Sequence, residues 1–307
     1  MNDTNTAAII NEINKLKEEK DALVLAHYYQ SLDVQKAADF CGDSFELAKR
    51  AKASDKRNIV FCGVKFMAES AKILNPDKRV FLPRHDAGCP MADMVTPENI
   101  IKHREAHPDA AVVCYINSSA ASKAVSDVCV TSSNAVKIVG KLPQKEIIFV
   151  PDKNLGAYVS KKLPEKTFYL HRGWCPTHKN LTAEDVIAAK KEYPGAPFAV
   201  HPECEEEVLA LADFIGSTSE ILKFSHETDA KTVIIGTEIG VVERLTEECP
   251  DKEIILLHEK LVCPNMKKTS LSDLLSALRE FSGEMIMSTE EMDAARRPLE
   301  RMLELGK

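Results

Sequence analysis

An internal threefold repeat constrains the fold of this 307-residue chain more than any other feature of its sequence. Three apolar segments, LVLAHYY, AVVCYIN and PFAVHPE, each carry a ring-bearing residue in the same place: His27, Tyr115 and His201. A hydroxyl residue follows each of them after 17 positions: Ser44, Ser132 and Thr218. Self-similarity at a fixed interval is typical of a chain that builds one structural unit several times. We therefore expect three equivalent units.

A second register mark supports the same repeat. The tetrapeptides NPDK, LPEK and CPDK place Pro76, Pro164 and Pro250 at intervals of 88 and 86 residues, and an apolar segment follows each of them. Each copy predicts strand, helix, strand, helix and strand, which is typical of a parallel sheet with helices on both faces. The apolar segments are nearly continuous, as expected for buried parallel strands. We predict an α/β fold of three similar three-layer αβα domains with parallel sheets, arranged with pseudo-threefold symmetry.

The domain boundaries follow this repeat. We place the first αβα repeat, with an N-terminal helix, at residues 1–107, the second at 108–193, the third at 194–283, and a C-terminal helix that packs back on the domains at 284–307. Helical patterns inside the repeats cover residues 44–53, 64–74, 133–142, 205–214 and 219–227. Two further helical segments, 270–281 and 290–305, are expected to cover the first repeat beside the N-terminal helix.

Four of the nine cysteines precede a proline, but the repeat separates them into two kinds. Cys249 corresponds to Asn75 and Leu163 in the other copies, so we interpret it as a turn residue. The other three occupy one equivalent position, 62, 60 and 62 residues after the ring-bearing residue of their copy: Cys89, Cys175 and Cys263. If three like domains pack around a threefold axis, these thiols converge near it. The remaining cysteines are interpreted as small buried hydrophobic residues.

Three convergent thiolates are soft ligands that suit an iron–sulfur cluster or zinc. A 4Fe-4S cluster held by three cysteines leaves one iron without a protein ligand, free to act as a Lewis acid. His178 lies three residues after Cys175 and offers the alternative of a Cys3His zinc site, although the other copies have no histidine there. Both sites remain open at this point.

The first strand of each copy is expected to deliver a pair of polar side chains to the same region. These pairs, at i and i+2, are His27 with Tyr29, Tyr115 with Asn117, and His201 with Glu203. Ligands of open parallel sheets bind beyond the carboxyl ends of the strands, so these six are candidate site residues. Ser44, Ser132 and Thr218 are expected at helix starts, where a hydroxyl usually caps the helix but can also bind a carboxylate or phosphate.

At these residues the sequence resembles the quinolinate synthase family. The segments that carry the resemblance are, in order, AHYYQ, GDSFELAK, YINSSAASKAVSDVCVTSSNA, GWCPTH, HPEC and VCPNMKKTSL. The resemblance implies condensation of iminoaspartate with dihydroxyacetone phosphate to quinolinate, phosphate and water in de novo NAD biosynthesis. It also implies one 4Fe-4S cluster on Cys89, Cys175 and Cys263, with the open iron as Lewis acid.

The resemblance further implies roles for the polar residues. Those expected to contact substrate or product are His27, Ser44, Tyr115, Asn117, Ser132, His201, Glu203 and Thr218. Tyr29, Glu203 and His27 are the expected catalytic residues, with Glu203 as a base and Tyr29 as an acid. An enzyme that produces iminoaspartate, L-aspartate oxidase or dehydrogenase, is a candidate partner.

The net charge of −7 provides no basic surface for nucleic acid, and the amphipathic N-terminal segment is neither a signal peptide nor a membrane span, so a cytoplasmic enzyme is expected. Two other functions fit three cysteines on this architecture. One is a cluster-dependent radical or reductase enzyme, and the other is an iron–sulfur sensor protein.

Overall fold

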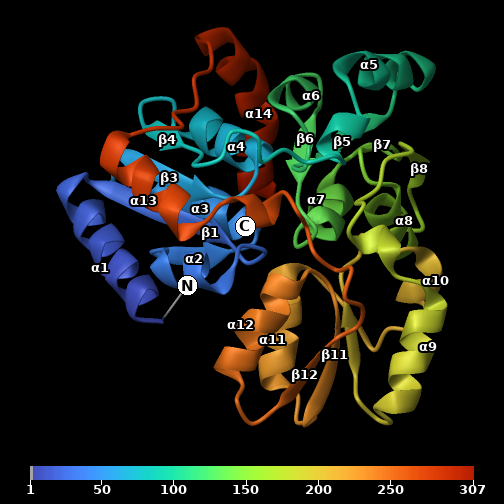
Figure 1. Cartoon of the computed structure of the whole chain (residues 1–307). Helices are drawn as coiled ribbons and strands as arrows, with labels where there is room; N and C mark the ends of the chain where they lie inside the picture. The colour runs from blue at the N-terminus through green and yellow to red at the C-terminus, as the bar shows by residue number, and fades with distance from the viewer. Residues whose placement is uncertain (1–2) are drawn as a thin grey trace.

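The computed structural model describes residues 3–307 and contains three separate four-stranded sheets (Figure 1). All strand pairs within these sheets are parallel. The first sheet consists of β1 (Ala22–His27), β2 (Phe40–Gly42), β3 (Asn58–Cys62) and β4 (Arg79–Phe81). The second consists of β5 (Ala111–Tyr115), β6 (Val128–Val130), β7 (Glu146–Val150) and β8 (Thr167–Leu170). The third consists of β9 (Phe198–Val200), β10 (Phe214–Ile215), β11 (Thr232–Gly236) and β12 (Glu253–Leu256).

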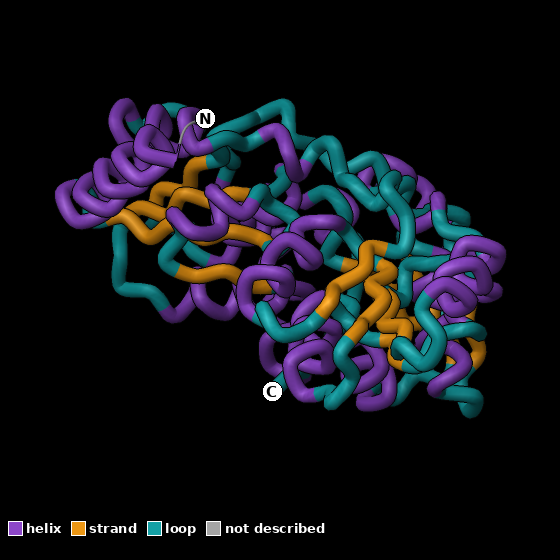
Figure 2. Tube along the Cα trace, turned by 60° about the horizontal axis from the view of Figure 1, so that its bottom comes forward, coloured by secondary structure: helices purple, strands orange, loops and turns teal. Residues whose placement is uncertain are grey.

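The three sheets share one strand order. It is β2-β1-β3-β4 in the first, β6-β5-β7-β8 in the second and β10-β9-β11-β12 in the third. Helices flank the strands on both sides, as the purple and orange segments of Figure 2 show. The predicted α/β class with three αβα units is therefore confirmed.

The sequence analysis missed one strand in each repeat. β2, β6 and β10 have only two or three residues and lie at a sheet edge, so they are too short to show a hydrophobic period. The predicted helix over 205–214 is wrong in its second half for this reason. Only α10 (Glu206–Leu209) is helical there, and the chain then turns into β10.

The other helical predictions within the repeats are confirmed to within two residues. They correspond to α3 (Ser44–Ala53), α4 (Lys65–Leu74), α7 (Ala135–Lys141) and α11 (Thr218–Glu227). The remaining helices of the repeats are α2 (Leu32–Ala37), α5 (Pro97–Ala106), α6 (Ala120–Ala124), α8 (Lys153–Lys162), α9 (Ala183–Glu192) and α12 (Ile239–Glu248).

Helix ends reproduce the register that the sequence predicted. Asn75, Leu163 and Cys249 are the C-cap residues of α4, α8 and α12, with nearly the same backbone angles. Cys249 thus lies where a helix ends before the last strand, at the turn position expected from its counterparts. Its thiol is buried, in contact with Nδ1 of His226 at 3.2 Å.

The terminal helices pack mainly against the first two repeats. α1 (Asp3–Glu19) and α13 (Leu271–Glu280) lie together on the first sheet, where Ile13, Val24 and Leu274 share one core cluster. α14 (Thr289–Leu305) packs against α4, α6 and α7, so it joins the first and second repeats. The helix over 270–281 therefore packs on the first sheet beside α1, as predicted, although it falls within the bounds given to the third repeat. Within residues 3–307, no helix is long and apolar enough to cross a membrane.

Candidate functional site

One cavity of about 130 Å³ gathers residues from all three repeats. The candidate site residues other than His178 all line it: His27, Tyr29, Ser44, Cys89, Tyr115, Asn117, Ser132, Cys175, His201, Glu203, Thr218 and Cys263. Residues that are about 87 positions apart in the chain meet here because each occupies the same place in its own sheet. The roles of these residues remain predictions.

The three cysteines lie on equivalent loops that follow the edge strands β4, β8 and β12. In each repeat, the helix that precedes the last strand begins with a residue that donates its backbone N–H to a carbonyl oxygen of this loop, at 2.8 Å. The three bonds run from Lys65 to Ala87, from Lys153 to Gly173 and from Ile239 to Leu261. A short 3-10 helix follows each cysteine: η1 (Ala92–Met94), η2 (His178–Asn180) and η3 (Met266–Lys268). Burial raises the pKa of all three thiols, that of Cys89 to about 12.

Buried acids cap the helices that precede two of these loops, and one of the acids also binds its loop. Glu238, the N-cap of α12, accepts hydrogen bonds from the backbone N–H of Cys263 at 3.1 Å and of Gly240 at 2.7 Å, and pairs with Lys267 at 3.1 Å. Asp152, at the equivalent N-cap of α8, accepts the backbone N–H of Leu155 at 2.7 Å. The first repeat has Val64 at this position, whose side chain cannot accept a hydrogen bond.

The strand ends orient two histidines in the same way. His27 ends β1, and its Nδ1 accepts the backbone N–H of Tyr29 at 3.1 Å. His201 follows β9, and its Nδ1 accepts the N–H of Glu203 at 3.4 Å. Burial is the main reason that the pKa of each imidazole falls to about 3, so both rings are neutral at pH 7.

Glu203 lies at the centre of the polar contacts. Its Oε1 accepts a hydrogen bond from the Tyr115 hydroxyl at 2.7 Å, and its Oε2 lies 2.8 Å from Nδ1 of His178. Burial opposes ionisation of this carboxyl, but His201, His178 and the Tyr115 hydroxyl outweigh it and lower the pKa of Glu203. Glu203 is therefore an ionised, buried carboxylate that can accept a proton from a ligand in the cavity.

The Tyr29 hydroxyl contacts two threonines. Its hydroxyl lies 2.7 Å from Oγ1 of Thr237 and accepts a hydrogen bond from Thr218 at 3.2 Å. Burial, and then the charge of Glu203, raise the pKa of Tyr29 well above its ordinary value. The phenol consequently stays protonated.

The three hydroxyl residues are not helix caps, contrary to their most ordinary interpretation. Asp43 and Ser217 cap α3 and α11, so Ser44 and Thr218 are the first residues of those helices and their hydroxyls are free to face the cavity. Ser132 lies in a turn before α7 instead of at a helix start. Among the described residues, the buried Oδ1 of Asn117 has no hydrogen-bond partner, which is consistent with an acceptor reserved for a ligand.

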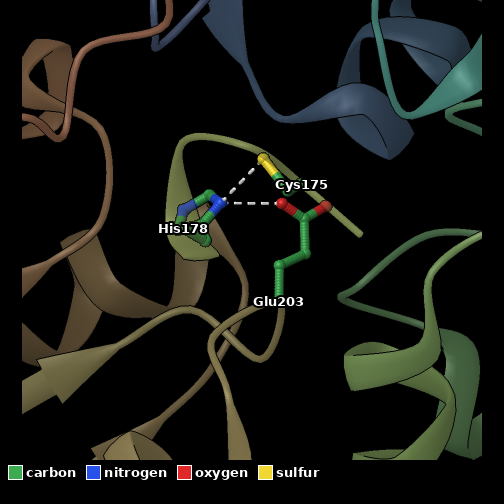
Figure 3. Close-up of side chains that lie close together, drawn as sticks. All are labelled: Cys175, His178 and Glu203. Carbon is green, nitrogen blue, oxygen red and sulfur yellow. Dashed lines mark hydrogen bonds and ion pairs between the residues drawn. The ribbon is translucent and has the colours of Figure 1, made fainter. Parts of the chain in front are cut away.

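His178 and Thr237 were underestimated by the sequence analysis. His178 was considered only as a zinc ligand beside three cysteines, yet it contacts Cys175 at 3.2 Å, Glu203, and Thr237 at 3.0 Å. Figure 3 shows its ring directed at both the thiol and the carboxylate. These three side chains could hold a metal ion, since their ligand atoms lie within 4.8 Å of one another. Thr237 directly follows β11, so the rule that ligands bind beyond strand ends could have identified it.

Comparisons with known proteins cover nearly the whole chain. A family profile described as Quinolinate synthetase A protein matches residues 11–304. The chain is 51% identical to the quinolinate synthase of Caldicellulosiruptor bescii, over 98% of this chain and 100% of that protein.

The chain belongs to the quinolinate synthase family. Two further members match the chain at nearly the same identity over nearly their full length. The quinolinate synthase of Sulfurihydrogenibium sp. is 49% identical over 97% of this chain and 99% of its own, and that of Clostridium perfringens has the same values. The quinolinate synthase family consists of enzymes, so the cavity shared by the three repeats is a candidate active site.

Proposed function

We propose that this chain is a quinolinate synthase, which condenses iminoaspartate with dihydroxyacetone phosphate to quinolinate, phosphate and water in NAD biosynthesis. The observation that carries the proposal is a single cavity lined by three equivalent cysteines, an ionised Glu203 and a protonated Tyr29. Membership of the family favours this activity over a radical or reductase enzyme and over an iron–sulfur sensor.

We propose that Cys89, Cys175 and Cys263 hold a 4Fe-4S cluster. The donor set fits, because three thiols on separate loops line one cavity and soft thiolates are the ligands of such clusters. Among residues 3–307, these three sulfurs do not form a group within 4.8 Å, as ligands of one ion would. Each cysteine of a cluster binds a different iron, which suits more widely spaced thiols. When bound, the cluster supplies an iron without a protein ligand as a Lewis acid.

The chain itself provides a continuous proton path between the proposed acid and the proposed base. With Nδ1–H of His178 donating to Glu203, Nε2 is left to accept from the Thr237 hydroxyl, which in turn accepts from Tyr29. This order of donors connects the phenol to the carboxylate through buried groups. As oriented, this chain passes a proton from Tyr29 towards Glu203. Once Glu203 has taken a proton from the substrate and Tyr29 has given one, the hydrogen bonds must reverse to return the proton from Glu203 to Tyr29 without bulk water.

Anionic substrate groups are proposed to bind at the helix ends. Ser44 and Thr218 are the first residues of α3 and α11, where the helix dipole and hydroxyls that do not cap the helix favour carboxylates and phosphates. Asn117 and Ser132 add polar groups from the second repeat. His27, Tyr115 and His201 are proposed to contact the substrate as well. The unstable iminoaspartate is proposed to come from L-aspartate oxidase or dehydrogenase.

The division of the chain into three repeats and a C-terminal helix, with boundaries near residues 107, 193 and 283, is likewise proposed.

An anaerobic assay with iminoaspartate and dihydroxyacetone phosphate, without any reductant, tests the proposal. Quinolinate is the expected product, and its absence from a sample with a full complement of cluster would refute the proposed activity. Omitting the reductant also separates this activity from that of an enzyme that uses its cluster for electron transfer.

Two variants test the ligand and the base. Cys175→Ala is expected to lose the cluster absorption, while the matched control Cys249→Ala keeps it; equal iron and sulfide content in both variants would contradict the ligand assignment. Glu203→Gln is expected to keep the cluster and to lose at least about 100-fold in turnover, because general base catalysis contributes about that much or more. Wild-type turnover in this variant would remove Glu203 from the mechanism.

A further inference from the structure

Cys175, His178 and Glu203 form a compact set of three different metal-binding groups (Figure 3). Nδ1 of His178 lies 3.2 Å from the Cys175 sulfur and 2.8 Å from Oε2 of Glu203. Bonds of about 2.0–2.3 Å from a tetrahedral Zn²⁺ place neighbouring ligand atoms roughly 3.3–3.6 Å apart. To surround one ion, Nδ1 must move away from each of the other two atoms by up to about half an ångström, and the sulfur and Oε2 already lie within 4.8 Å of each other.

The surrounding contacts already orient these groups as ligands. Nε2 of His178 lies 3.0 Å from the Thr237 hydroxyl, and Oε1 of Glu203 is held by Tyr115 at 2.7 Å. Metal-binding histidines and carboxylates commonly use their second polar atom in this way, which fixes the ring and the carboxylate. Nδ1 and Oε2 remain, and they lie within 4.8 Å of the Cys175 sulfur and of each other.

We propose that the cluster-free chain binds one Zn²⁺ ion through Sγ of Cys175, Nδ1 of His178 and Oε2 of Glu203. One thiolate, one imidazole and one carboxylate suit zinc, and three protein ligands leave a fourth position for water. Cys175 and Glu203 both line the cavity, so the fourth position is on the cavity side. Binding displaces the thiol proton of Cys175, and the ring proton of His178 moves to Nε2, from which it donates to Thr237.

This zinc site excludes the two proposed features of the active enzyme. Cys175 cannot serve the zinc ion and a cluster at the same time, and Glu203 bound to zinc cannot act as a base. Zinc would therefore compete with cluster assembly and inactivate the chain. The site differs from a three-cysteine site because it uses neither Cys89 nor Cys263.

Cobalt titration of the reduced, cluster-free, full-length chain tests this site, since Co²⁺ reports a thiolate ligand by its charge-transfer absorption. We expect one Co²⁺ per chain, displaced by one Zn²⁺. Cys89→Ser and Cys263→Ser are matched controls that should bind Co²⁺ like the wild type although they cannot hold the proposed cluster. Cys175→Ser should lose the charge-transfer band, and His178→Ala should weaken binding at least tenfold.

A second measurement needs no variant. X-ray absorption of the zinc-loaded wild type should give one sulfur and three nitrogen or oxygen neighbours. Three sulfur neighbours, or cobalt binding that requires Cys89 and Cys263 but not His178, would overturn the proposal in favour of a three-thiol site. Absence of stoichiometric binding would overturn it as well. None of these results depends on whether the chain makes quinolinate.

Discussion

Replacing Asp43 by asparagine should stabilise the protein at neutral pH. Asp43 is buried, and its Oδ1 caps α3 by accepting the N–H groups of Phe45 and Glu46, both at 3.0 Å. Its Oδ2 accepts from the Ser219 hydroxyl at 2.9 Å, but that hydroxyl also lies 2.7 Å from Oε2 of Glu46. A single hydroxyl proton thus serves two carboxylates. Burial, with Glu46 adding to it, raises the pKa of Asp43 from 3.8 to about 6.

The magnitude follows from this difference in pKa. Below pH 3.8 the carboxyl is protonated in both the folded and the unfolded chain, whereas above pH 6 it is ionised in both. Between these values the folded chain binds more protons, so its stability falls as the pH rises. At about 1.4 kcal/mol for each tenfold change in proton affinity, ionised Asp43 costs about 3 kcal/mol above pH 6. The asparagine oxygen still caps α3, and its NH₂ group can donate to Ser219.

Urea unfolding of the reduced, metal-free protein, followed by circular dichroism, measures the effect. Asp43→Asn should unfold with a free energy higher by up to about 3 kcal/mol at pH 7.5, and this gain should shrink to about 1 kcal/mol at pH 4.5. The matched control Ser219→Ala removes the shared donor and should lower stability at pH 7.5 by about 1–2 kcal/mol. An asparagine variant less stable than the wild type at pH 7.5, or one with an unchanged pH dependence, would refute the reasoning.

Two further substitutions test the acid that holds the Cys263 loop and the close packing beside it. Glu238→Gln leaves the Lys267 ammonium without its counterion and places an amide NH₂ group against the N–H of Cys263 or Gly240. We therefore expect the free energy of unfolding in urea to fall by about 3 kcal/mol. We also expect less iron per chain after reconstitution. The double variant with Lys267→Met should recover part of that stability, and no recovery would argue against the ion pair. Gly240→Ala would place a Cβ atom 2.5 Å from the carbonyl oxygen of Tyr28, so the melting temperature should fall; a rise, as for an ordinary helical glycine, would contradict this packing.

Much of the fold could be predicted because its signal is local. The helix over 44–53 was predicted to the residue, since its apolar period and polar flanks lie within ten positions. The edge strands β2, β6 and β10 could not be predicted, because two or three residues carry no period and their pairing depends on a strand elsewhere in the chain. The helix over 270–281 was expected to cover the first repeat, and it packs on the first sheet as predicted.

The sequence by itself determined which residues are equivalent. The repeat intervals assign Cys89, Cys175 and Cys263 to one position and remove Cys249 from it, and they place a ring residue at the start of each unit. Such equivalent positions can be found by counting along the chain, because each repeat folds with the same strand order and ends its helices at equivalent residues.

Only the tertiary structure decided how these positions meet and which partners they have. It brings Glu203 to Tyr115 and His178, gives Tyr29 its contact with Thr237, and frees Ser44 and Thr218 from capping. It also places one thiol beside a histidine and a carboxylate, from which the zinc site is inferred. Such contacts depend on the packing of one repeat against another and on burial, which fixes the protonation of each group, and neither is encoded in the spacing of residues along the chain.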